Sequence, residues 1–291
     1  MDSKTKFLLT TAFIFVVLGL LFIFQSQNTG KLRLIFCDVG QGDGILIISP
    51  SGRQAVVDGG PGNKMVDCLG KYMPFSDRTV ELMVSTHPQT DHMEGLIGIL
   101  ENYEVKTIAT TGVPAKIKLY DVWEDSTKAE NATIYTPNIG DTVVLDPQGP
   151  VTLTVLWPPS DKVSEWQARP PADLNKTAIV MRLNYGPSTG SGFCAYLTAD
   201  ITKEILEQIV DKPCALLKIA HHGSRTGTSE AVVDKIRPQI AAIQNSKNNS
   251  YGHPHKETLD ILNSRNVKVL RNDLSGTVEV DVDNMGIVIS D

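Results

Sequence analysis

The segment Val84–Gly95 reads Val-Ser-Thr-His-Pro-Gln-Thr-Asp-His-Met-Glu-Gly, and it constrains the fold of this chain more than any other segment. Its pattern predicts a short strand that ends at His87 and a helix over Met93–Leu100. Two imidazoles and a carboxylate, those of His87, Asp91 and His92, therefore share one tight loop. Open α/β sheets bind ligands at such strand ends, and both groups are ligands of divalent metals. The loop fits either a metal site or a helix start capped by Asp91.

Histidine and aspartate recur at the ends of other predicted strands. Strand and helix patterns alternate from Leu32 onward, which predicts mixed sheets covered by helices in a layered α/β sandwich. Five polar side chains come at or just after predicted strands, namely those of Asp58, His87, Asp200, His221 and His253. The chain has six histidines, and five of them lie in such loops: His87, His92, His221, His222 and His253. This placement favours a metal site over a capped helix with surface histidines.

Bulk composition narrows the class of protein. A length of 291 residues suits one large domain or two small ones. The net charge of -6 argues against a generally nucleic-acid-binding surface, although a local basic groove stays compatible with it. No two of the four cysteines form a Cys-x-x-Cys pair, which argues against a structural zinc site. Cys37 and Cys194 lie in apolar runs and are interpreted as buried thiols rather than ligands, with a disulfide left open.

The N-terminal segment differs from the rest of the chain. Lys4 and Lys6 precede Phe7–Phe24, an apolar run without charges that is near the roughly 20 residues needed to cross a bilayer. A signal-peptide core is usually shorter, so we interpret the run as a transmembrane anchor, with a cleaved signal as the alternative. The lysines should stay on the cytoplasmic side, which places the remainder outside. We therefore expect an anchor or signal with its linker over 1–30 and a globular domain over 31–291.

Two further segments carry structural expectations. Residues 112–150 give a mixed pattern, with strands expected at Thr133–Tyr135 and Thr142–Leu145. Trp157–Leu174 is rich in proline and lacks periodicity, so it is predicted to be a long loop or lid. Its Trp157 and Trp166 either stack nucleobases or pack against each other within that lid.

Sequence blocks that contain these residues resemble the metallo-β-lactamase fold, and most closely the extracytoplasmic domain of ComEC-type DNA-uptake proteins. The resemblance covers about Leu32 to the end of the chain. It implies an αββα fold, a metal-bound hydroxide and hydrolysis of a phosphodiester. The blocks are Asp38-Val-Gly-Gln-Gly-Asp43, Val57-Asp58-Gly-Gly60, Thr86-His87-Pro-Gln-Thr-Asp91-His92, Leu197-Thr-Ala-Asp200, and Lys218-Ile-Ala-His221-His-Gly-Ser224 with Tyr251-Gly-His253-Pro254.

The resemblance also implies a ligand set, from which this sequence departs. Gln89 stands where the family has a histidine or aspartate ligand, and a neutral amide is a poor ligand for a transition metal. His87 would share its position with Gln89 and Asn175, which are weak ligands. We therefore expect one firmly held zinc or manganese ion and a weak second site. The strong ligands of the first site would be Asp91, His92, Asp200 and His253.

The expected roles follow from hydrolytic metal chemistry. Asp91 takes a proton from the nucleophilic water, and Asp200 bridges or orients the metal. His221 or His222 protonates the leaving alkoxide or holds the scissile phosphate. His222 could equally orient a ligand, and Asp58 is interpreted as an orienting residue rather than a ligand.

These inferences predict a metal-dependent phosphodiesterase or nuclease that acts on DNA outside the cytoplasmic membrane, with single-stranded DNA as a candidate substrate. The N-terminal helix would attach it to the membrane, where it could act beside a separate channel protein. Two alternatives remain. One is a degenerate module that binds nucleic acid or a partner without turnover. The other is a hydrolase of a non-nucleotide ester, since one fold can serve many chemistries.

Overall fold

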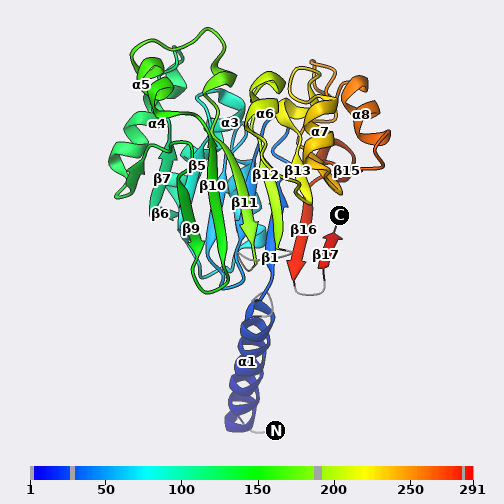
Figure 1. Cartoon of the computed structure of the whole chain (residues 1–291). Coiled ribbons are helices and arrows are strands. Elements are labelled where there is room, and N and C mark those ends of the chain that lie inside the picture. Colours follow the sequence, from blue (N-terminus) through cyan, green and yellow to red (C-terminus); the bar gives the residue numbers. More distant parts are fainter. Residues whose placement is uncertain (1–2, 27–29, 187–191, 284–285, 291) are drawn as a thin grey trace.

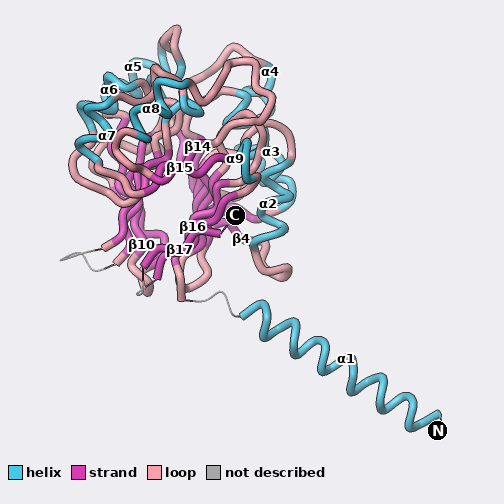
Figure 2. The backbone as a smooth tube through the Cα atoms, turned by 90° about the vertical axis from the view of Figure 1, so that its right-hand side faces the viewer, coloured by secondary structure: helices cyan, strands magenta, loops and turns pink. Residues whose placement is uncertain are grey.

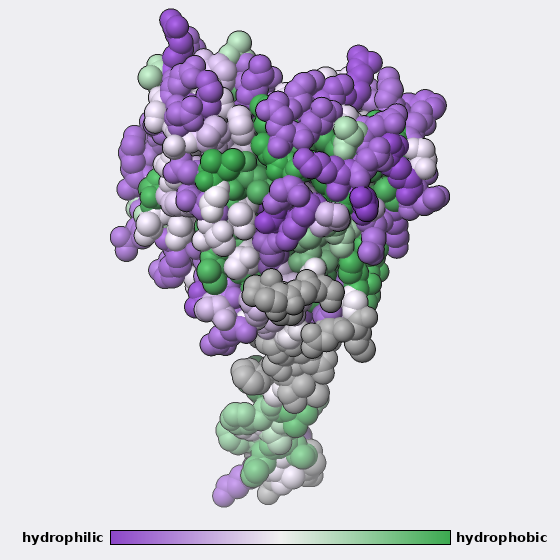
Figure 3. Space-filling view, viewed as in Figure 1, coloured by the Kyte–Doolittle hydropathy of each residue, from purple (hydrophilic) through white to green (hydrophobic). Residues whose placement is uncertain are grey.

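The computed structural model describes residues 3–26, 30–186, 192–283 and 286–290. Helix α1 (Ser3–Ser26) extends from one end of a sandwich that contains all other elements (Figures 1 and 2). Large apolar side chains on α1 are exposed, for example Phe7 and Phe15, and Figure 3 shows this hydrophobic surface. The sequence predicted a transmembrane helix here. Within the described residues, no helix is long and apolar enough to cross a membrane.

Eight strands of the described chain form the first sheet. Their bounds are β1 Leu32–Phe36, β2 Ile45–Ile48, β3 Gln54–Val57, β5 Leu82–Ser85, β7 Thr107–Thr110, β8 Thr133–Tyr135, β16 Val278–Asp283 and β17 Gly286–Ser290. The order across the sheet is β17-β16-β1-β2-β3-β5-β7-β8. The pairs from β17 to β3 are antiparallel, whereas β3, β5, β7 and β8 run parallel. A separate pair joins β4 (Thr79–Val80) to β6 (Glu104–Val105).

The second sheet contains seven of the described strands. They are β9 Thr142–Asp146, β10 Val151–Trp157, β11 Val180–Tyr185, β12 Phe193–Leu197, β13 Leu216–Lys218, β14 Ile240–Ile243 and β15 Lys268–Arg271. Their order is β15-β14-β13-β12-β11-β10-β9, with parallel pairing from β12 to β15. The parallel strands of both sheets are followed by the loops that carry the predicted site residues.

Helices cover the outer face of each sheet. Those over the first sheet are α2 (Lys64–Tyr72), α3 (Thr90–Asn102) and α4 (Lys118–Ala129), and those over the second are α6 (Lys203–Ile209), α7 (Glu230–Ile236) and α8 (Lys256–Asn263). The remaining helical segments are α5 (Ser160–Ala168), α9 (Asn272–Ser275), and the 3₁₀ turns η1 (Leu174–Thr177) and η2 (Ala220–Gly223). Together with the two facing sheets, these layers make an αββα sandwich, as the sequence predicted (Figure 2).

The strand sequences explain this layering. Leu32, Leu34 and Phe36 of β1 join the core between the two sheets, whereas Ile35 and Cys37 join the core beneath the helices. Because successive side chains of a strand point to opposite faces, a strand buried on both faces is largely apolar. The same holds for β2 and β3, which are buried over their whole length. The buried polar exceptions, Arg33 of β1 and Gln54 of β3, are hydrogen-bonded to Glu279 and Asp77.

Two helices longer than a single turn were missed by the sequence interpretation. Helix α4 lies in the segment that gave a mixed pattern, and α5 lies in the expected loop Trp157–Leu174. Pro158 and Pro159 precede α5 and two further prolines follow it, so the prolines bound this helix rather than interrupt it. Trp157 and Trp166 have ring centroids 6.1 Å apart, and the buried Trp166 packs within the segment. This supports the packing alternative over base stacking.

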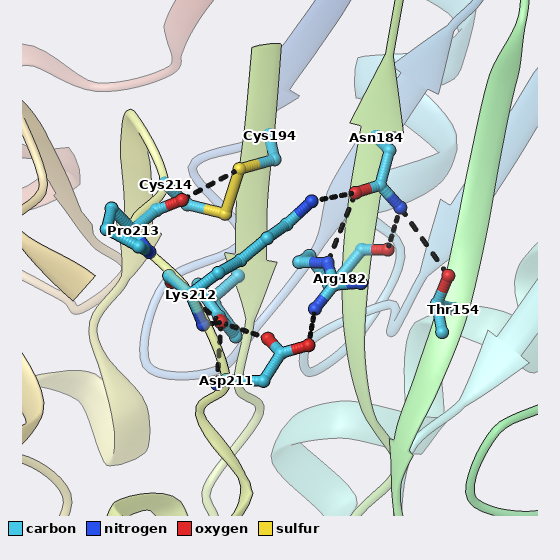
Figure 4. The surroundings of a disulfide bond; sticks show 9 residues. Thr154, Arg182, Asn184, Cys194, Asp211, Lys212, Pro213 and Cys214 are labelled. Carbon is cyan, nitrogen blue, oxygen red and sulfur yellow. Dashed lines mark hydrogen bonds and ion pairs between the residues drawn. A yellow bond between two sulfur atoms is a disulfide. The ribbon is translucent and has the colours of Figure 1, made fainter. Parts of the chain in front are cut away.

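The four cysteines form two disulfides, Cys37–Cys68 and Cys194–Cys214. The sequence interpretation of buried thiols was therefore right about burial and wrong about the thiols, because sequence alone gives no distances between cysteines. Figure 4 shows the second disulfide beside Asp211, whose Oδ1 accepts a 2.6 Å hydrogen bond from the hydroxyl of Tyr196. The expected linker, the Gly/Ser-rich turn before β12 and the turn of the final hairpin fall partly or wholly outside the described residues.

Candidate metal centre

Loops after four parallel strands converge on one site. Asp58 follows β3, and the loop after β5 carries His87 and leads to Asp91 and His92 in the first turn of α3. In the second sheet, Asp200 follows β12, and His221 and His222 follow β13. The carboxyl ends of parallel strands share one edge of a sheet, which brings these side chains together.

Four of these side chains form a compact group: Asp91, His92, Asp200 and His222. Their ligand atoms all lie within 4.8 Å of one another. Asp200 Oδ2 is 3.3 Å from His92 Nε2 and 3.3 Å from His222 Nε2. Asp91 Oδ2 lies 3.4 Å from His222 Nε2. All but Asp91 are buried, so one face of the group is open to solvent at Asp91.

Both histidines of this group are oriented through their second ring nitrogen. His92 Nδ1 is 2.8 Å from Asp58 Oδ2, which agrees with the orienting role predicted for Asp58. Asp58 is itself fixed by the amide and hydroxyl of Thr86, which donate at 2.9 and 2.7 Å. His222 Nδ1 is 2.9 Å from the carbonyl oxygen of Gln244. Such partners fix the tautomer, and here they direct each Nε2 toward the shared carboxylates.

A buried ion pair lies directly behind the group. The ammonium of Lys218, a residue that is 0% exposed, contacts Asp43 and donates to the carbonyl oxygen of Ala199 at 3.2 Å. The backbone N–H of Asp43 in turn donates to the Asp91 carbonyl oxygen at 3.2 Å. This pair connects the loop that contains Gly40 and Asp43, between β1 and β2 of the first sheet, to β13 of the second sheet.

The charges of the group perturb its pKa values strongly. Burial disfavours the charged imidazole of His92, but Asp200, Asp58 and Asp91 outweigh it and raise its pKa well above the usual value. Asp200 likewise raises the pKa of His222 well above its usual value against the effect of burial. Burial opposes ionisation of Asp200, yet His222 and His92 hold its pKa well below the usual range. The positive charges of the two imidazoles and the negative charges of the carboxylates therefore stabilise each other within the group.

The backbone is strained at the same place. Four non-glycine residues near the group have left-handed φ angles, Asp58 at 59°, Ala199 at 45°, His221 at 52° and His222 at 55°. Such conformations cost of order 1–3 kcal/mol each and persist only where the surrounding structure enforces them. In η2 the two consecutive left-handed residues turn the His222 side chain inward while His221 stays partly exposed. Strain of this kind concentrates at functional sites.

The group fits a divalent cation. His92 Nε2 and His222 Nε2 are buried, have no hydrogen-bond partner among the described residues, and both face Asp200 Oδ2 at 3.3 Å. An unsatisfied buried polar atom typically costs about 1–3 kcal/mol, so two at one point require an explanation. Two imidazoles and two carboxylates are a ligand set that suits zinc or manganese. A bound cation would satisfy both nitrogens at once.

His87 lies beside the group but is already engaged. Its Nδ1 is 2.9 Å from Thr86 Oγ1, its Nε2 is 3.2 Å from Gln89 Oε1, and its ring centroid is 4.1 Å from that of His92. Burial, with His92 adding to it, lowers the pKa of His87 to about 3, so this imidazole is neutral. Asn175 is buried, and its Oδ1 has no hydrogen-bond partner among the described residues.

Two predicted residues lie at the rim of the group. His221 Nε2 is 3.8 Å from Asp200 Oδ2, and the side chain is 31% exposed. The ring of His253 is 6.3 Å from that of His222, and His253 is not in the compact group. His222, which the sequence offered as an acid or an orienting residue, lies within the group, in the place where His253 was expected. Tandem histidines after a strand signal a site, but a sequence cannot tell which ring a left-handed turn directs inward.

The sandwich is the fold of the metallo-β-lactamase superfamily, whose members are its structural neighbours. The Zn²⁺-bound PqqB from Methylobacterium extorquens matches with a TM-score of 0.50 and 13% identity, over 79% of this chain and 85% of that one. An isothiocyanate hydrolase from Delia radicum gut bacteria matches with a TM-score of 0.44 and 11% identity, over 82% and 95% of the two chains. No family model matches the chain.

The curated relatives are competence and recombination proteins. ComE operon protein 3 of Bacillus subtilis is 26% identical over 300 residues, which cover 95% of this chain and 36% of that protein. Recombination protein 2 of Haemophilus influenzae is 24% identical over 277 residues, which cover 89% of this chain and 30% of that protein. The chain thus spans about a third of the length of these relatives.

Proposed function

We propose that this protein is a metal-dependent phosphodiesterase that acts on DNA, with the sandwich outside the cytoplasm. The observation that carries the proposal is the group formed by Asp91, His92, Asp200 and His222, in which the buried Nε2 atoms of both histidines lack a hydrogen-bond partner among the described residues. These four residues would hold a zinc or manganese ion. When bound, such an ion lowers the pKa of its water toward neutrality and makes hydroxide available for attack on phosphorus.

Asp91 within the group and His221 at its rim have separate roles in this proposal. Asp91, the most exposed of the four, takes the proton of the nucleophilic water. Burial lowers the pKa of His221, so its ring is neutral near pH 7 and has one N–H. Thr226 Oγ1 lies 3.5 Å from His221 Nδ1, and His221 Nε2 faces Asp200. We assign the N–H to Nε2, from which His221 donates a hydrogen bond to the scissile phosphate in this proposal.

Substrate and location rest on separate support. The relatives named for competence favour DNA as substrate. Two disulfides within one chain favour an oxidising compartment outside the cytoplasm. The charge-free run Phe7–Phe24 and its exposed apolar side chains favour attachment of α1 to a membrane. A separate channel protein in the same membrane is a partner consistent with this arrangement.

A second function is favoured by one observation at the rim of the group. His87 Nε2 is occupied by Gln89 Oε1, and the neutral amides of Gln89 and Asn175 are the other oxygens expected there. If two metal ions are needed for turnover, the protein would bind nucleic acid without cleaving it. This candidate differs from the first in turnover alone, so one assay separates them.

The decisive experiment measures metal-dependent cleavage of single-stranded DNA and of bis-p-nitrophenyl phosphate by the full chain, across a series of divalent metals. Asp200→Asn should abolish cleavage and most metal binding, because Asp200 contacts both histidines of the group. Asp121→Asn, at an exposed position of α4, is the matched control and should retain cleavage and metal binding. Cleavage that survives in Asp200→Asn or after chelation refutes the proposal. DNA binding without turnover under every metal supports the second function.

A further inference from the structure

Tyr251 is an exposed aromatic residue close to the metal centre. It lies in the loop between β14 and α8, and 65% of its surface is exposed. Its ring stacks on that of His253, with centroids 5.6 Å apart and planes inclined by 22°. One face of the tyrosine ring is therefore covered by His253, and much of the remaining ring surface is open to solvent. The sequence interpretation placed its candidate stacking residues elsewhere, at Trp157 and Trp166.

Several hydrogen bonds hold the loop that presents this ring. The backbone N–H of His253 donates to Asn249 Oδ1 at 2.9 Å. The carbonyl oxygen of His253 accepts from the side-chain amides of Asn249 and Asn245 at 2.7 and 3.1 Å. On the other side, His255 Nδ1 accepts from the N–H of Arg225 at 3.1 Å. Because the ring is held before binding, little conformational entropy is lost when a ligand stacks on it.

A short series of rings connects Tyr251 to the metal centre. The ring centroid of His253 lies 5.6 Å from that of Tyr251. It lies 5.6 and 6.3 Å from the ring centroids of His221 and His222. His222 belongs to the metal-binding group and His221 faces Asp200. A phosphate held at the centre and a base stacked on Tyr251 would thus be one or two nucleotides apart along a strand.

Charge adds little along this path. A hollow of about 450 Å³ adjoins the loop, and its two lysines, Lys64 and Lys247, are matched by two aspartates, Asp38 and Asp273. The chain as a whole carries a net charge of -6, so phosphate neutralisation alone supplies little affinity. Stacking on an aromatic face does not depend on charge or on base identity. In an acidic protein, base stacking on such a ring therefore supplies affinity for single strands that phosphate contacts do not supply.

We propose that Tyr251 is a nucleobase-stacking platform that binds a base of single-stranded nucleic acid next to the phosphate in the metal centre. The proposal rests on the proposed function and deepens it by naming the form of the substrate. Bases in a duplex stack on each other and cannot offer a face to Tyr251, so the platform selects single strands.

The test measures the dissociation constant of a fluorescent single-stranded oligonucleotide for the metal-loaded full chain, with a phosphorothioate backbone that resists cleavage. Tyr251→Ala should weaken binding about tenfold, the size typical of one lost base stack. Tyr251→Trp should retain it. Phe75→Ala is the matched control, because Phe75 is 85% exposed and lies before β4, away from the site loops. A strand with abasic sites opposite the platform should show no loss in Tyr251→Ala.

The outcomes separate this proposal from the proposed function. Equal binding by wild type and Tyr251→Ala, equal loss on normal and abasic strands, or no binding by wild type overturns the platform. Hydrolysis of bis-p-nitrophenyl phosphate by wild type is measured in parallel. If hydrolysis fails while the base-dependent loss is seen, the hydrolase proposal falls and the platform stands. Thermal unfolding of each variant checks that the fold is intact.

Discussion

The buried ion pair between Lys218 and Asp43 yields a quantitative prediction. Lys218→Met keeps the side-chain volume and removes the charge, which leaves Asp43 buried without its ammonium partner. Breaking one side of a buried ion pair costs about 3–5 kcal/mol, and His222 Nδ1, 3.3 Å from Asp43 Oδ1, compensates only part of the charge that remains. The free energy of unfolding should fall by that amount, and the melting temperature by roughly 6–20 °C for a domain of this size. Tryptophan fluorescence during urea unfolding measures the change.

A double-mutant cycle distinguishes the ion pair from loss of packing. Asp43→Asn in the Lys218→Met background removes the unpaired charge, so the double variant should be more stable than the sum of the single effects implies. Lys235→Met on the exposed surface of α7 is the matched control and should change stability by less than about 0.5 kcal/mol. A Lys218→Met protein as stable as the control, or strictly additive effects, would refute this account of the pair.

Three further perturbations test other parts of the structure. Gly42→Ala should lower both metal affinity and stability, because the added Cβ would lie 2.1 Å from a backbone oxygen at the start of α3 and the φ angle of Gly42 is +151°. Calorimetric metal titration measures the affinity, and unchanged affinity and stability contradict the clash. A metal binds neutral imidazoles, and the pKa values of His92 and His222 are raised, so metal affinity should fall as the pH decreases and metal binding at pH 7 should release protons. Calorimetric titration in buffers of different ionisation enthalpy counts the released protons. A metal affinity that does not change with pH contradicts the charge balance. Replacing Cys194 and Cys214 by serine opens a loop with a sequence separation of 20 and should cost about 3 kcal/mol of unfolding free energy in urea, whereas an unchanged midpoint contradicts a structural role.

Local patterns predicted much of the fold. The apolar runs of β1, β2 and β3 indicated strands because each is buried on both faces, and their spacing indicated the layered sandwich. Helix α5 was missed because its prolines were interpreted as breaking the segment, whereas they lie at its two ends. The disulfides were left open, since no local pattern encodes which strands and helices bring cysteines together.

The site was predictable in kind and less so in detail. Asp91, His92 and Asp200 come together as strand-end chemistry indicates, and Asp58 supports His92 as expected. The inward turn of His222 depends on two successive left-handed residues, a conformation that tertiary packing imposes and no sequence pattern announces. The importance of Lys218 was equally hidden, because a lysine beside a histidine pair resembles an exposed phosphate contact until its burial is known.

The four residues of the metal-binding group are divided equally between the two halves of the sandwich. Asp91 and His92 come from the half built on the first sheet, and Asp200 and His222 from the half built on the second. Each half contributes only one imidazole and one carboxylate to this group, so its four ligands are complete only when the two halves are packed together. Binding of an ion at this group therefore requires that both halves have folded and packed against each other, so metal affinity reports on completed folding.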